Sequence, residues 1–361
     1  MKNIYSQLLD YHGSAQLPVI ATVVRTRGSA PQVPGSSALF DDKGLVAGTV
    51  GGGAVEKKIQ EISGQRFVSG NSGCFHFNLK NDISKKEEAI CGGQITILVD
   101  AEAEKHLHVM KEMQASLNEQ EPGVLLTYVI VDKEDNAVID RYWVTNTLKP
   151  PMTDLLKSRS EAVVKEMLLR ADPSSFCEAD LTSETGKEAY LFFEPVFPPM
   201  KLVIAGAGHI GRALAHLGRL IGFEVTVVDD RPEYANSENI PDAAHIITDD
   251  VGKVMRGLPK GPDTYIVIVT RGHKDDAEAL KACIASDNGY LGMIGSKSKI
   301  QAIREEFMSN GWATSLQWDA VHSPIGLEIN SRTVEEIAIS IAAELIMVKN
   351  GRKKKIKGCP A

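Results

Sequence analysis

The sequence lacks any apolar run near the roughly 20 residues that a membrane-spanning helix needs, which excludes a membrane protein. It has no excess of positive charge, since its formal net charge is -7, and nothing in that balance suggests a nucleic-acid partner. Its five cysteines are an odd number without C-x-x-C spacing, which argues against a disulfide framework and a structural zinc site. The N-terminus has no signal-peptide pattern. We therefore expect a cytoplasmic protein.

The length of 361 residues favours two domains, because one hydrophobic core rarely organises so long a chain. Three prolines within the segment 194–199 mark the boundary, since proline ends helices and disfavours central strands. We expect an N-terminal domain over 1–195, a C-terminal domain over 200–349 and a basic, disordered tail over 350–361. In the first domain, apolar runs predict strands at 19–24, 38–40, 95–99, 124–131 and 189–193, with helices near 55–62 and 102–117. This is a mixed α/β domain with a largely antiparallel sheet.

After the boundary, strand and helix patterns alternate almost regularly. Strands are predicted at 202–205, 225–228, 246–248, 265–270 and 290–294, and helices at 210–221, 275–285 and 297–308. Such alternation predicts an α/β fold with a doubly wound parallel sheet, so the C-terminal domain is expected to be Rossmann-like. A last helix over 334–348 is apolar on one face. That face either closes the Rossmann core or forms a homodimer.

The segment Gly206-Ala207-Gly208-His209-Ile210-Gly211 carries a G-x-G-x-x-G pattern directly after an apolar strand and at the start of a helix. Gly206 would allow the tight turn, Gly208 would let the backbone approach a phosphate, and Gly211 would let helix and strand pack closely. Free amides and the helix dipole then attract an anion. The sequence therefore predicts a site for a phosphate-bearing ligand.

Asp229 ends the next strand, where an acidic residue can bind adenosine ribose hydroxyls. Arg231 follows closely, and its guanidinium can instead bind a phosphate. NAD and NADP therefore both remain open, as do another phosphate-bearing cofactor and a scaffold without a ligand.

Two further loops follow strands of the predicted parallel sheet, at the edge where ligands bind. Arg271 and His273 lie in one of them and can contact a phosphate or a ring substituent; the alternative is that Asp275 or Asp276 caps the next helix. Gly295 and Ser296 lie in the other, which also reads as a helix start. The segment 322–326 reads as a turn.

Three segments of the first domain are rich in small residues: Arg25 to Pro31, Gly48 to Glu56, and Cys91-Gly92-Gly93. The triplet Gly51-Gly52-Gly53 can form an anion-binding turn, or it is a plain hairpin turn. Cys91 would lie at a loop edge where a thiolate is accessible, although a free cysteine is also commonly a small buried hydrophobe.

The order of these segments resembles the XdhC/CoxI family, accessory proteins of molybdenum hydroxylases such as xanthine dehydrogenase. The resemblance spans nearly the whole chain. In the first half it rests on 26–31, on 48–53 with Glu56, and on 91–93. In the second half it rests on 205–209, 229–232, 270–273, 294–297 and 323–327.

The resemblance implies a chaperone that binds the molybdenum cofactor (molybdopterin), holds it while a cysteine desulfurase installs the terminal sulfur, and delivers it to a xanthine dehydrogenase-type hydroxylase. No catalytic residue is assigned. The candidate cofactor-binding residues are Arg27, Ser29, Gly51, Gly52, Gly53, Glu56, Cys91, Gly206, Gly208, His209, Gly211, Asp229, Arg231, Arg271, His273, Gly295 and Ser296. Cys91 is also the candidate metal ligand, because molybdenum accepts a soft thiolate.

Two alternatives belong to other classes. An NAD(P)-dependent oxidoreductase would use the same glycine loop and Asp229, but His273 is the one obvious proton-transfer residue. A subunit of the hydroxylase itself would need iron–sulfur or flavin motifs, and the cysteine spacing provides none.

Overall fold

The computed structural model describes residues 4–11, 16–79 and 92–351, and the chain divides into two compact units between Pro198 and Pro199. Cys91 and residues 352–361 of the predicted basic tail lie outside the described residues, whereas residues 350 and 351 belong to the last helix. Each unit is described by itself. None of the helices in the described ranges is long and apolar enough to cross a membrane.

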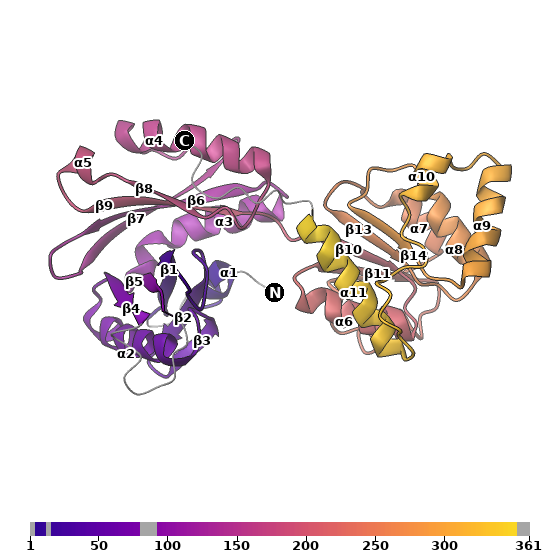
Figure 1. The fold of residues 1–361 in the computed structure, drawn as a ribbon, viewed down its shortest axis with the longest axis horizontal. Helices are drawn as coiled ribbons and strands as arrows, with labels where there is room; N and C mark the ends of the chain where they lie inside the picture. The colour runs from indigo at the N-terminus through magenta and orange to yellow at the C-terminus, as the bar shows by residue number, and fades with distance from the viewer. Residues whose placement is uncertain (1–3, 12–15, 80–91, 352–361) are drawn as a thin grey trace. The chain divides into compact units, whose positions relative to one another are not determined.

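The N-terminal unit contains two antiparallel sheets (Figure 1). The first has the order β3-β2-β1-β5-β4 and the second the order β7-β6-β9-β8. The strands of the first sheet are β1 Val19–Arg27, β2 Ser37–Asp41, β3 Gly44–Gly48, β4 Gly73–Asn78 and β5 Gln94–Asp100. Those of the second are β6 Gly123–Val131, β7 Ala137–Thr145, β8 Cys177–Asp180 and β9 Ala189–Val196. The expected antiparallel character is confirmed.

Helices α2 and α4 cover the outer faces of the two sheets, and α1 and α3 pack against their inner faces. Val55 and Ile59 of α2 pack on one face of the first sheet, and Leu156 and Val164 of α4 pack on the outer face of the second. The two inner faces pack against each other. The helices of this unit are α1 Ile4–Leu9, α2 Gly53–Ser69, a short 3-10 helix Ala103–His106, α3 Leu107–Asn118, α4 Asp154–Arg170 and α5 Thr182–Thr185.

Strand β9 continues through Pro195, although the proline cluster had indicated that the strand ends earlier. Its neighbour β8 is paired only as far as Phe193, so beyond that point β9 has β6 as its single partner. A proline is tolerated there because an edge position does not require its missing amide hydrogen.

The C-terminal unit is a single parallel sheet with the order β12-β11-β10-β13-β14. Helices α6 and α11 pack on one face, and α7, α8 and α9 pack on the other (Figure 1). The elements are β10 Lys201–Ala205, α6 His209–Leu220, β11 Glu224–Asp229, β12 His245–Thr248, α7 Val251–Gly257, β13 Thr264–Ile268, α8 His273–Lys281, β14 Tyr290–Met293, α9 Lys297–Ser309, α10 Ser315–Asp319 and α11 Val334–Gly351. The predicted doubly wound sheet is confirmed.

The apolar face of α11 closes the core of this unit. Ile341 and Leu345 are fully buried in the cluster that contains Leu214 of α6. The interpretation that this face closes the Rossmann core is therefore confirmed. Ile339, Ile346 and Met347 of the same helix are exposed.

A buried ion pair joins the two sheets of the N-terminal unit. The guanidinium of Arg141 on β7 donates hydrogen bonds to Asp100 of β5, with a closest distance of 3.1 Å, and also to Thr127. Both charged side chains are almost completely buried. Burial opposes the charge on Arg141, but Asp100, Tyr5 and Glu194 together outweigh that effect and raise the Arg141 pKa.

We predict that Arg141→Ala destabilises the N-terminal unit by about 3–5 kcal/mol, because it leaves the Asp100 carboxylate buried without its partner. Urea unfolding followed by circular dichroism measures the loss. Arg159→Ala is the control, since it breaks the solvent-exposed pair with Glu184 and should cost less than about 1 kcal/mol. Equal losses in the two variants would contradict the prediction.

Candidate functional site

The glycine corner of the C-terminal unit, residues Gly206 to Gly211, connects β10 to α6. Gly206 has φ +119°, and a methyl group added there would lie 2.5 Å from the Val269 carbonyl oxygen. A methyl group at Gly211 would lie only 1.9 Å from the Gly206 carbonyl oxygen. Both positions therefore require glycine, for the turn and for close packing respectively.

Gly208 differs from these two glycines. It has φ −69° and is the N-cap of α6, and a methyl group added there would meet no atom within 4 Å. No side chain caps this helix, so the amides of its first turn lack the usual side-chain acceptor. The structure therefore has open space in front of Gly208, where an anion can approach backbone donors. His209 is exposed at the same turn.

Asp229 is tied to this corner. Its carboxylate accepts hydrogen bonds from the Ala207 amide at 2.7 Å and from the Arg231 guanidinium at 2.8 and 2.9 Å. Burial opposes ionisation of Asp229, but the hydrogen bonds from Arg231 and Ala207 outweigh it and hold its pKa below the usual value. Asp229 therefore fixes the glycine corner, and a ribose hydroxyl would have to compete with Arg231 for its oxygens.

Arg231 and Arg271 lie on neighbouring loops at the same edge of the sheet. The Arg231 guanidinium stacks on the Tyr234 ring at 4.0 Å. The Arg271 guanidinium, which is largely exposed, lies 3.4 Å from an oxygen of Asp230. The loops after β11 and β13 are thus linked by an exposed ion pair, and cationic groups flank the glycine corner.

His273 lies at the start of α8, where its imidazole is 3.2 Å from the Glu306 carboxylate of α9. Ser296 is the N-cap of α9 and accepts a hydrogen bond from the Lys299 amide, so the helix-start interpretation of Gly295 and Ser296 is correct. Asp276 accepts hydrogen bonds from Thr270 and from Lys299, which ties the loop after β13 to α9. Binding roles for His273, Gly295 and Ser296 stay predictions.

The small-residue loops of the N-terminal unit converge. A methyl group at Gly93 would lie 2.4 Å from the Arg27 carbonyl oxygen, and the Gly93 amide donates to the Ser29 carbonyl at 3.0 Å. A methyl group at Gly51 would lie 2.7 Å from the Pro31 ring. Segments that are far apart in sequence therefore meet around 27–31.

The triplet Gly51-Gly52-Gly53 connects β3 to α2, so it is a strand-to-helix turn and not a hairpin turn. Glu56 stabilises this turn through two hydrogen bonds. Its carboxylate accepts from the Thr49 hydroxyl at 2.7 Å and from the Val50 amide at 3.2 Å. Methyl groups at Gly52 and Gly53 would meet no atom within 4 Å. Binding by this turn stays a prediction.

Of the cysteines in the part of the chain that the structure describes, Cys177 is disulfide-bonded, which the sequence did not lead us to expect, and Cys74 and Cys283 are free and buried. Burial raises the pKa of Cys74 to about 12 and that of Cys283 to about 11, so neither thiol is a ready thiolate at neutral pH. Across residues 4–11, 16–79 and 92–351, no three His, Cys, Asp or Glu side chains are grouped to hold a metal ion. The prediction for Cys91 remains untested.

The sequence did not reveal Glu344, which anchors the 322–327 turn. Its carboxylate accepts from the Tyr290 hydroxyl at 2.5 Å and from the Gly326 amide at 2.8 Å, and lies 3.0 Å from His322 Nδ1. This role could have been inferred from the sequence, because Glu344 is an acidic residue on the mainly apolar face of α11.

A parallel sheet with a glycine corner defines the C-terminal unit as a Rossmann domain. Residues 202–345 match the family model described as the XdhC Rossmann domain, and residues 14–78 match that of the XdhC and CoxI family. This chain therefore belongs to the XdhC/CoxI family, as the order of motifs predicted.

Two curated proteins and one solved structure are similar to the chain. A Bacillus subtilis strain 168 protein, named as a probable xanthine dehydrogenase subunit, is 25% identical over 97% of this chain and 98% of the relative. The uncharacterised protein YqeB of Escherichia coli strain K12 is 34% identical over 42% of this chain, which spans only 27% of that protein. The crystal structure of a xanthine dehydrogenase from Bacillus halodurans shares the fold, with a TM-score of 0.75 and 22% identity over 97% of this chain and 96% of that one.

We predict that Gly211→Ala destabilises the C-terminal unit by about 1–3 kcal/mol or more, because the new methyl group would collide with the backbone of Gly206. Gly208→Ala is the matched control in the same turn and should cost no more than about 1 kcal/mol, since its methyl group enters open space. Thermal unfolding of both variants measures the difference. A Gly211→Ala variant as stable as Gly208→Ala would show that the corner is looser than described.

Proposed function

We propose that this chain is an accessory protein that binds the molybdenum cofactor, assists its sulfuration and inserts it into a xanthine dehydrogenase-type molybdenum hydroxylase. The family matches in both units support this proposal, as does the full-length likeness to a protein named for xanthine dehydrogenase. In this proposal a cysteine desulfurase supplies the sulfur. The proposal also places the chain in the cytoplasm.

The glycine corner fits the anionic tail of such a cofactor. The uncapped first turn of α6 offers backbone amides, and the space in front of Gly208 is open. The nearest carboxylate, Asp229, is already neutralised by Arg231, so it does not repel a phosphate. This combination of open amides and a compensated carboxylate is the observation that carries the proposal.

The residues of the chain would bind and orient the cofactor and carry out no redox step themselves. Amides from Gly208 to Gly211 would hold the phosphate, and the guanidinium groups of Arg231 and Arg271, which are paired with Asp229 and Asp230, would lie at the same sheet edge. The cofactor supplies the molybdenum and dithiolene sulfur at which the receiving hydroxylase works. The geometry gives no comparable support to a nicotinamide cofactor, since the Asp229 oxygens that would bind its ribose are engaged by Ala207 and Arg231.

We predict that Gly208→Val lowers retention of molybdopterin by at least about tenfold, because the added side chain fills the space in front of the amides while the fold has room for it. The full-length protein is incubated with molybdopterin and desalted, and the retained pterin is quantified by mass spectrometry. Thermal unfolding checks that the variant is folded.

Gly257→Val at the end of α7 is the control, because Gly257 is also exposed and open but lies away from the corner. It should retain pterin like the unmodified protein. Equal retention by Gly208→Val would refute the role of the corner, provided that adding Arg27→Gln to that variant does not lower retention. Retention of NADH but not of pterin by the unmodified protein would favour the oxidoreductase alternative.

A further inference from the structure

A polar surface lies on the first sheet of the N-terminal unit, where β1, β5 and β4 run side by side. Arg25 pairs with Thr96 and Thr96 with His76, and the next aligned row contains Arg27, Gln94 and Asn78. Side chains alternate between the faces of a sheet, so these six residues share one face. Further along β4 and β5, the same face carries Cys74 and Leu98, which pack against the second sheet. The polar surface is the continuation of that buried face.

This surface is hollowed into a cavity of about 350 Å³. Its lining is the three-by-three block of residues 25–27, 76–78 and 94–96. The middle row, Thr26, Ile95 and Phe77, separates the two polar rows. The volume falls in the range of small-molecule sites, at its lower end.

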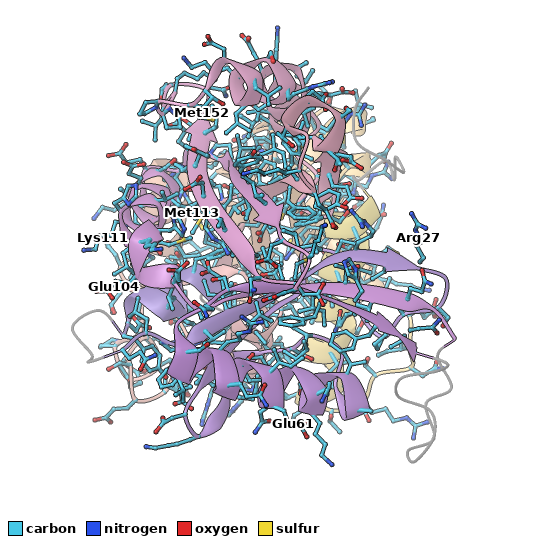
Figure 2. The ribbon with its side chains drawn as sticks, turned by 90° about the vertical axis from the view of Figure 1, so that its left-hand side faces the viewer. Arg27, Glu61, Glu104, Lys111, Met113 and Met152 are labelled. Carbon is cyan, nitrogen blue, oxygen red and sulfur yellow. The ribbon has the colours of Figure 1, made fainter. Side chains whose placement is uncertain are left out.

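The two arginines of the cavity differ in their partners. Two guanidinium nitrogens of Arg25 each lie 2.8 Å from an oxygen of the Glu178 carboxylate, and the guanidinium lies over the Tyr190 ring at 4.8 Å. Its charge is therefore compensated and its position fixed. The Arg27 side chain is exposed and extends away from the ribbon (Figure 2), with no hydrogen bond or ion pair to any described residue. Among the residues that the structure describes, Arg27 is the positive charge of the cavity without an acidic partner.

The remaining polar groups suit the edge of a heterocycle. The imidazole Nδ1 of His76 lies 2.9 Å from the Thr96 hydroxyl, which orients the ring. Asn78 and Gln94 carry carboxamides, which combine a donor and an acceptor in one plane. A guanidinium binds a phosphate with two parallel hydrogen bonds. The cavity thus combines an anion-binding cation with groups that can bind a polar ring.

We propose that this cavity is a second ligand site, specific for the phosphate monoester of a heterocycle of nucleoside or pterin size. Arg27 binds the phosphate, and His76, Asn78 and Gln94 contact the ring. Such a ligand has two sources, a mononucleotide or molybdopterin itself; the second rests on the proposed function, whereas the first does not. The site is distinct from the glycine corner, which belongs to the other unit.

The test uses the full-length Gly208→Val protein, in which the glycine corner is blocked, so that binding in the N-terminal unit is measured alone. Isothermal titration calorimetry is carried out with guanosine 5′-monophosphate and, separately, with molybdopterin. Arg27→Gln is introduced into this background and should weaken binding at least about tenfold. Arg27→Lys, which keeps the charge but loses the planar fork, should weaken it less.

Lys133→Gln is the matched control. It removes an exposed positive charge from the turn between β6 and β7, which contacts the opposite end of β4 at Gly73, and it should leave binding unchanged. Binding of either probe that depends on Arg27 supports the proposal, and the probe that binds identifies the source. The proposal is overturned if neither probe binds, or if Arg27→Gln binds like Lys133→Gln. In either case the pterin retention of the unmodified protein still tests the proposed function independently.

Discussion

The close approach of the α6 backbone to the end of β10 is the constraint on which the C-terminal unit depends. A methyl group at Gly211 would lie 1.9 Å from the Gly206 carbonyl oxygen, so the helix begins almost in contact with the strand it follows. The first turn of α6 has no side-chain cap, and the space around Gly208 is open. Packing excludes side chains at Gly206 and Gly211, whereas a side chain would fit at Gly208, and its absence there leaves backbone donors accessible.

The hydrogen bonds of Asp229 bear on which ligand the proposed site at this corner would accept. In a dinucleotide-binding site, an acidic residue at this position is available to ribose hydroxyls. Here its carboxylate is used to fix the Ala207 amide and the Arg231 guanidinium. The result is a rigid corner with a compensated acid, which suits a phosphate better than a sugar. One motif can therefore serve different ligands, depending on a residue two positions further along the chain.

The sequence predicted the C-terminal unit well because its strands are continuous apolar runs and its glycines have local roles. It was less informative for the N-terminal unit. Strand β7 was not predicted, because Asp140 and Arg141 interrupt its apolar pattern. Arg141 is buried only through its long-range pairing with Asp100. Helix α4 was not predicted either, because the polar residue Ser160 lies among the residues that the helix buries. In β7 a tertiary partner, not local propensity, decides the burial of the charged side chain, whereas the Ser160 hydroxyl donates to the Lys157 carbonyl within its own helix.

The candidate site of the N-terminal unit could not be assembled from motifs for a related reason. Each motif could be read locally, but the contact between the Gly93 amide and the Ser29 carbonyl joins segments that are distant in sequence. The register of β1, β5 and β4 then aligns two rows of polar residues beyond the region where the second sheet covers the first. The second sheet covers only part of this face of the first sheet. The face is therefore apolar where the second sheet packs on it and polar beyond that region. The polar end of that face is where this unit can meet a ligand without exposing its core.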